Sequence, residues 1–251
     1  MPKPLLLVSV LWCWLAAAWA DAPVAGKQVD RTLEFADGYT MGYLLYLPEE
    51  YDSDDKKWPL LLFLHGRGES NGSLDVVKTW GPPRWIEMGE KYPYVVASPQ
   101  CPADQAWSDT QQQSYLLGLL NYLQDSFKID TDRIYLTGLS MGGYGSLILA
   151  ADQPGRFAAL LSISCGGKTE DAARLKDVPI WIFAGRDDET VPYEWSANMA
   201  DALIKAGNQH VLFTSVEHIG HNCWSAAYAL PGVYDWLDAQ SLADRGSGAA
   251  N

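Results

Sequence analysis

Basic residues are scarce in this sequence. The 251 residues include 18 lysines and arginines against 31 aspartates and glutamates, which gives a formal net charge of −13. A surface of that sign repels phosphate groups, so we expect neither nucleic acids nor anionic membranes as partners. The sequence also shows no internal repeat and no low-complexity linker that would separate two domains. With 48% hydrophobic residues, it predicts one domain with one sizeable core.

Cysteine is also rare. The four cysteines are Cys13, Cys101, Cys165 and Cys223. None of them has the C-x-x-C spacing of a structural zinc site, and no dinucleotide-binding glycine motif is present. We therefore expect neither a metal nor an organic cofactor. For the last three cysteines two states stay open: one disulfide with one free thiol, or three buried thiols.

Long hydrophobic runs are missing except at the N-terminus. Residues 5–19 are largely apolar, follow Lys3 and end in Ala18-Trp19-Ala20, which is the pattern of a secretory signal peptide and its cleavage site. The run is shorter than the roughly 20 residues that a membrane-spanning helix needs. We interpret residues 1–20 as a signal peptide rather than a membrane anchor. Its removal takes away one lysine, lowers the net charge to −14, and predicts a secreted or periplasmic protein.

The rest of the chain alternates between strand-like and helix-like segments. Residues 29–35 and 40–47 flank Asp37-Gly38, a turn dipeptide, and predict an N-terminal antiparallel hairpin. Short apolar runs typical of strands buried on both faces follow at 59–64, 94–98, 134–138, 157–164, 179–184 and 210–216. Residues 111–128 and 193–206 have helical spacing of apolar side chains.

This alternation predicts an α/β fold with a mostly parallel, doubly wound sheet. We expect residues 21–241 to form a single domain. Residues 242–251 are rich in glycine, alanine and serine and predict a flexible tail. The predicted sixth and seventh strands are joined by residues 166–178, which is too short a connection for a large cap domain.

One motif carries candidate chemistry. Gly138-Leu-Ser140-Met141-Gly142 lies between a predicted strand and a helix-like stretch, which is the setting of a nucleophile elbow. The sharp turn strains the serine backbone, and the two glycines leave room for it. Ser140 is therefore the candidate nucleophile, and the amide of Met141 at the helix N-terminus is a candidate oxyanion donor. A plain glycine-rich turn or a phosphate-binding loop would fit the same motif. Candidate acid and histidine partners elsewhere in the sequence are needed to distinguish a nucleophile from these alternatives.

An acidic loop follows the apolar run at 179–184. It reads Gly185-Arg-Asp-Asp-Glu-Thr-Val-Pro192 and resembles the Gly-x-x-Asp-x-x-Val-Pro loop of single-domain secreted esterases of the α/β-hydrolase superfamily. The resemblance implies Asp188 as the triad acid. Asp187 is the second choice and Glu189 the third.

The same resemblance extends to the segment after the last predicted strand. Gly220-His221-Asn-Cys-Trp224 is similar to the histidine loop of that family, which implies His221 as the general base. It also makes Trp224 the best candidate among the tryptophans for a substrate-binding side chain. His218 is the alternative base, although a structural or solvent-facing role fits it better, and His210 is expected to be structural.

A further loop resembles the oxyanion loop of the superfamily. His65-Gly-Arg67-Gly68-Glu69 follows the predicted strand at 59–64. The resemblance implies the amide of Arg67 as the second oxyanion donor, with Gly68 as an additional one. His65 would anchor the loop through hydrogen bonds.

The family includes feruloyl and acetyl-xylan esterases, polyhydroxyalkanoate depolymerases and predicted peptidases. The resemblance therefore implies a serine carboxylesterase that acts through an acyl-enzyme, with a small or polymer-attached ester as substrate, including feruloylated or acetylated plant-wall material. A serine peptidase of the same fold and a non-catalytic scaffold are the alternatives.

Overall fold

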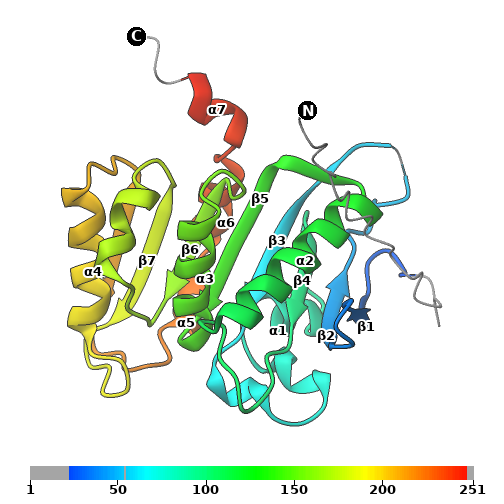
Figure 1. The fold of residues 1–251 in the computed structure, drawn as a ribbon, viewed down its shortest axis with the longest axis horizontal. Helices are drawn as coiled ribbons and strands as arrows, with labels where there is room; N and C mark the ends of the chain where they lie inside the picture. The colour runs from blue at the N-terminus through cyan, green and yellow to red at the C-terminus, as the bar shows by residue number, and fades with distance from the viewer. Residues whose placement is uncertain (1–22, 54, 248–251) are drawn as a thin grey trace, which may run out of the picture.

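The fold is built on one eight-stranded sheet. The computed structural model describes residues 23–53 and 55–247 (Figure 1). The strand order is β1-β2-β4-β3-β5-β6-β7-β8. The strands are β1 (Gln28–Glu34), β2 (Thr40–Tyr46), β3 (Trp58–Leu64), β4 (Val95–Pro99), β5 (Ile129–Leu139), β6 (Ala159–Ile163), β7 (Ile180–Gly185) and β8 (Val211–Val216).

The helices connect these strands. The α-helices are α1 (Gly81–Glu87), α2 (Thr110–Ser126), α3 (Met141–Asp152), α4 (Tyr193–Lys205), α5 (Trp224–Tyr228), α6 (Pro231–Asp238) and α7 (Leu242–Ser247). Three 3₁₀ segments are η1 (Arg67–Ser70), η2 (Leu74–Thr79) and η3 (Thr169–Leu175). Figure 1 shows α2, α3 and α4 in front of the sheet and α6 behind it.

The predicted hairpin is confirmed. β1 and β2 pair antiparallel from Gln28 opposite Tyr46 to Glu34 opposite Thr40. Gly38 at the turn has φ +86°, a conformation that glycine adopts without strain. β2 then pairs antiparallel with β4, and all later neighbours in the sheet are parallel.

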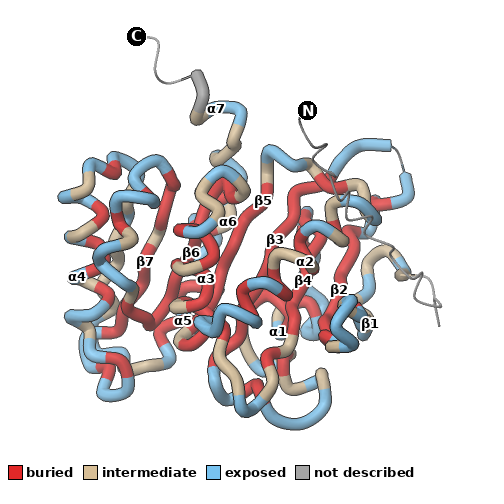
Figure 2. The backbone as a smooth tube through the Cα atoms, in the orientation of Figure 1, coloured by how far each residue is buried: buried red, intermediate tan, exposed pale blue. Residues whose placement is uncertain are grey.

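Both faces of the sheet are covered, as a doubly wound fold requires. Every residue of β3 is buried (Figure 2). Leu60, Leu62 and Leu64 belong to a core cluster shared with α2, α3 and α4. Leu61 and Phe63 point the other way, into clusters that include residues of α1, α5 and α6. The predicted mostly parallel, doubly wound sheet is therefore confirmed.

The connection between β6 and β7 spans residues 164–179 and contains η3. Cys101, Cys165 and Cys223 are all buried and free, so of the two states left open by the sequence the structure has three thiols. Burial raises the pKa of the Cys165 thiol to about 12. A thiol of that kind stays protonated and behaves as a small apolar side chain.

The proposed signal peptide, residues 1–20, lies outside the described residues. Within the described part of the chain, no helix has the length and apolar character that crossing a membrane requires.

The predicted flexible tail, residues 242–251, begins with a helix. Residues 242–247 form α7, and Arg245 attaches this helix to the body of the protein. The Arg245 guanidinium donates hydrogen bonds to the carbonyl oxygens of Pro154 at 3.0 Å and Ala158 at 2.8 Å, and to that of Phe157. The composition of the segment did not indicate this contact, because the contact depends on the single side chain of Arg245.

We expect Arg245→Ala to lower the free energy of unfolding by about 2 kcal/mol, because three backbone carbonyls lose a charged donor. Urea unfolding of the two proteins measures the difference. Arg174→Ala is the control, since Arg174 is an exposed side chain that pairs with Asp152 and Asp171, and the loss of these surface pairs should cost at most about 1 kcal/mol. Equal effects of the two substitutions would contradict an attached α7.

Candidate active site

Ser140 occupies a strained turn between β5 and α3. Its backbone angles are φ 51° and ψ −118°, outside the conformations that a non-glycine residue prefers. Strain of this kind costs about 1–3 kcal/mol and persists only where the surroundings enforce it. The turn is held by two hydrogen bonds, from the Ser140 amide to Ile163 O at 2.9 Å and from the Tyr144 amide to Ser140 O at 3.1 Å.

The two motif glycines are needed because backbone segments meet there. A Cβ at Gly142 would lie 1.9 Å from the Leu64 carbonyl oxygen, and a Cβ at Gly138 would lie 2.3 Å from the Gly142 carbonyl oxygen. Real Cβ atoms do not approach backbone so closely. The first turn of α3 is therefore pressed against the carboxyl ends of β3 and β5, and the serine side chain is presented at the helix N-terminus.

Three of the predicted site residues form a hydrogen-bonded relay. Ser140 Oγ lies 2.9 Å from His221 Nε2, and His221 Nδ1 lies 2.7 Å from Asp188 Oδ2. An ionised carboxylate can only accept, so Nδ1 carries the imidazole proton and Nε2 is left to accept the serine proton. This is the arrangement of a nucleophile, a base and an orienting acid.

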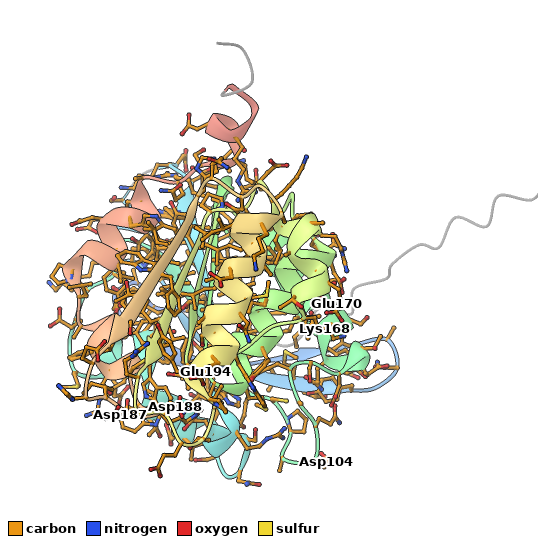
Figure 3. All side chains as sticks on the ribbon, turned by 90° about the vertical axis from the view of Figure 1, so that its left-hand side faces the viewer. Asp104, Lys168, Glu170, Asp187, Asp188 and Glu194 are labelled. Carbon is orange, nitrogen blue, oxygen red and sulfur yellow. The ribbon has the colours of Figure 1, made fainter. Side chains whose placement is uncertain are left out.

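The structure distinguishes the three acids of the acidic loop by position. The Asp188 side chain is 2% exposed. Its Oδ1 accepts hydrogen bonds from the amides of Thr190 at 2.9 Å and Val191 at 2.8 Å, which leaves Oδ2 for His221. Asp187 and Glu189 are exposed. Figure 3 shows Asp187 and Asp188 at the end of the molecule where α4 begins, marked there by Glu194 in its first turn.

The other histidines lie outside this relay. His218 is exposed and has φ +58°, and His210 is exposed just before β8. His65 is fully buried. Of the four, His221 is the one that contacts Ser140.

His65 holds the loop after β3 in place. The amide of Cys101 donates to its Nε2 at 2.9 Å, so Nδ1 carries the proton and donates to Gly66 O at 2.6 Å. Trp107 Nε1 donates to the His65 carbonyl oxygen at 3.0 Å. Burial lowers the pKa of His65 to about 4, so the ring is neutral at neutral pH. Its contribution is positional.

This loop runs beside the serine. A Cβ at Gly66 would lie 3.6 Å from Ser140 Cβ. Arg67 follows, with its guanidinium turned away to donate to Gln105 O at 2.5 Å. Met141 is the first residue of α3, and a backbone amide in the first turn of a helix has no hydrogen-bond acceptor within that helix. The Gly66 backbone is thus next to the nucleophile, and the predicted oxyanion donors Met141 and Arg67 directly follow Ser140 and Gly66 in the chain.

The sequence predicts no role for Glu69, yet this residue is a buried part of the same loop. The residue is 6% exposed, and burial raises the pKa of its carboxyl, an effect that backbone hydrogen bonds from Gly66 and Glu69 itself oppose. Gln100 Nε2 donates to the Glu69 carbonyl oxygen at 3.0 Å. Glu69 therefore ties the loop after β3 to the loop after β4.

Ser164 was also missed, and it contacts the histidine loop. It follows β6, is 1% exposed and has φ +50°. Its Oγ donates to the His221 carbonyl oxygen at 2.7 Å and lies 3.0 Å from Cys223 Sγ. No motif marks this serine, because its role depends on two loops that are far apart in the sequence.

Trp224, the predicted substrate-binding side chain, is largely buried beside His221. It is 7% exposed, and its ring meets the His221 imidazole edge-on at 5.0 Å between centroids and an angle of 87°. Trp80 packs on it in turn at 5.9 Å. Neighbouring side chains cover the ring, so it supports the imidazole instead of offering an open face. Trp195, at the start of α4, is 52% exposed.

No group of three or more histidine, cysteine or acidic side chains that could hold a metal ion occurs within residues 23–53 and 55–247. The chemistry of the relay itself needs protein groups alone.

Comparison with known proteins gives a family match and several relatives. The Esterase family model matches residues 38–238. A solved structure of a thermostable esterase is 31% identical with a TM-score of 0.74, over 87% of this chain and 64% of the other.

Two curated relatives are more distant. An acyl-protein thioesterase 1 homolog of Dictyostelium discoideum is 27% identical over 44% of this chain. The "Probable feruloyl esterase C" of Aspergillus terreus is 24% identical over 80% of this chain and 74% of its own. The chain spans about half of the thioesterase's length, 51%.

We expect Ser164→Ala to lower kcat about fivefold with little change in KM, because the lost hydrogen bond of about 1 kcal/mol orients His221 and does not touch substrate. Steady-state kinetics on a chromogenic ester measures kcat and KM separately. Ser146→Ala is the matched control, since Ser146 is equally buried and donates to a backbone carbonyl, Gly143 O, at 2.8 Å. An equal loss of kcat in the control would show that Ser164 acts through stability alone.

Proposed function

The chain belongs to the Esterase family, and we propose from this that it is a serine hydrolase that cleaves carboxylic esters through an acyl-enzyme. Its fold is the α/β-hydrolase fold that the sequence predicted. The observation that carries the proposal is the relay from Asp188 through His221 to Ser140, with contacts of 2.7 and 2.9 Å.

In the first step His221 Nε2 takes the proton of the Ser140 hydroxyl as Oγ attacks the ester carbonyl carbon. The carbonyl oxygen becomes an oxyanion, and the amides of Met141 and Arg67 stabilise it. The tetrahedral intermediate then expels the alcohol, which receives the proton from His221. A water molecule, deprotonated by the same imidazole, attacks the acyl carbon; the bond to Ser140 Oγ breaks, the carboxylic acid leaves, and the imidazolium returns the proton to Oγ.

Asp188 keeps the imidazole in the required tautomer and stabilises the imidazolium that forms in each step. Two backbone amides already bind its Oδ1, which holds the carboxylate in place. The low exposure of the carboxylate strengthens its interaction with the imidazolium.

We further propose that the substrate is a bulky or polymer-attached ester, such as feruloylated or acetylated plant-wall material. The short β6–β7 connection supports this, because it carries a 3₁₀ segment where a large cap would otherwise restrict entry. The relative named as a feruloyl esterase supports it as well. The signal-peptide pattern of residues 1–20 supports a secreted or periplasmic location, where such polymers are found.

The proposed activity predicts that the chain hydrolyses p-nitrophenyl acetate and that Ser140→Ala lowers kcat at least about a thousandfold without loss of fold. Absorbance assays and thermal unfolding of both proteins test this. A panel of feruloylated and acetylated oligosaccharides and a peptide anilide then tests the substrate class. Turnover of the anilide without turnover of any ester would replace the esterase by a peptidase, and a folded chain inactive on all of them would be a scaffold.

The acid assignment predicts that Asp188→Asn lowers kcat about a thousandfold or more, because the amide favours the wrong imidazole tautomer. Asp187→Asn, which removes the same charge from the adjacent exposed residue, should change kcat less than about twofold. Kinetics of the two variants side by side decides between them. A larger loss in Asp187→Asn would assign the acid to Asp187.

A further inference from the structure

An aromatic-lined cavity lies away from the Ser140 relay. It has a volume of about 420 Å³, within the usual range for small-molecule sites. Its walls come from α1, from the segment that precedes β4, and from α5 and α6. β4 is parallel to β3, so the segment before β4 belongs to the opposite edge of the sheet from the turn that holds Ser140.

Five aromatic side chains surround this cavity: Trp85, Tyr92, Tyr94, Tyr228 and Tyr234. Trp85 and Tyr234 are partly exposed, and the other three are buried. Such side chains offer flat apolar surface together with polar edges, which suits ligands that have both kinds of surface.

The rings are held in fixed orientations. The hydroxyls of Tyr92 and Tyr234 are 2.8 Å apart, and their rings meet edge-on at 5.3 Å. Tyr234 Oη also donates to the Tyr228 carbonyl oxygen at 3.2 Å. A ligand would therefore meet walls that are already ordered and would lose little affinity to ordering them.

The polar groups of the cavity select against an anionic ligand. The carboxylate of Asp238 accepts a hydrogen bond from Tyr94 Oη at 2.8 Å, and Glu90 adds a second carboxylate to the lining. The lysine of the lining, Lys91, already pairs with Glu49 at 2.8 Å. Two carboxylates beside one neutralised ammonium repel phenolic acids and uronic acids, but they accept hydrogen bonds from uncharged hydroxyl groups.

We propose that this cavity binds one ring of a neutral polysaccharide. The C–H face of the sugar packs on Trp85 and Tyr234, and its hydroxyls donate to Asp238 and Glu90. Because the cavity and the Ser140 turn belong to opposite edges of the sheet, the site binds polymer separately from the ester that reacts. The inference goes beyond the proposed function and stands or falls on its own.

The test uses xylotriose as a neutral probe and the Ser140→Ala protein as host, so that turnover does not interfere. We expect xylotriose to shift the ¹⁵N–¹H resonance of the Trp85 indole. We also expect Asp238→Asn and Trp85→Ala each to raise the dissociation constant of xylotriose, measured by isothermal titration calorimetry, about tenfold. The matched control is Asp235→Asn. Asp235 is an exposed aspartate of the same helix that does not line the cavity, so its substitution should leave the dissociation constant unchanged.

In the catalytically intact chain, Trp85→Ala should leave p-nitrophenyl acetate turnover as it was, since Trp85 has no part in the relay. If the Trp85 indole resonance does not shift at high xylotriose concentration, the proposal is wrong. Unchanged affinity in both cavity variants of normal thermal stability, or binding of ferulic acid there in place of xylotriose, would also overturn it. If xylotriose binds while the intact chain turns over no ester, the proposed function fails and this site remains.

Discussion

The close approach of the first turn of α3 to the carboxyl ends of β3 and β5 is the constraint on which the candidate site depends. Gly142 lies against the Leu64 carbonyl with no room for a methyl group. That contact sets the strained angles of Ser140 and brings the loop after β3 alongside it. The sheet, buried on both faces, is the rigid support that makes the strain sustainable.

Around that turn, the loops are joined by buried hydrogen bonds. His65 connects the loop after β3 to that after β4, and Ser164 connects the loop after β6 to the histidine loop. Asp188 is fixed by two amides of its own loop. Each bond is modest alone, but together they hold donors and acceptors from five strand ends in one arrangement, which is the condition for preorganised electrostatics.

The sequence predicted the features that depend on local chemistry. The Asp37-Gly38 turn, the alternation of strands and helices, and the strand-to-helix position of Ser140 follow from residue types within a short window. The loops carrying Asp188 and His221 were identified by resemblance, and in the structure His221 contacts Ser140 while Asp188 contacts His221.

Features that depend on contacts between distant segments were not predicted. Ser164 orients a loop 57 residues away, and nothing in its neighbourhood indicates this. The exposure of Trp224 is decided by Trp80 and the imidazole packed on it. In α7, a segment of weak helical composition becomes ordered because Arg245 reaches carbonyl groups near β6.

The three buried thiols have a consequence for where this fold can form. Within the described residues no covalent cross-link joins one element to another, so oxidants and reductants leave the connectivity of the chain unchanged. The sheet, the strained turn and the loops around it are held by non-covalent contacts. The described fold therefore needs no disulfide, whether its surroundings are reducing or oxidising.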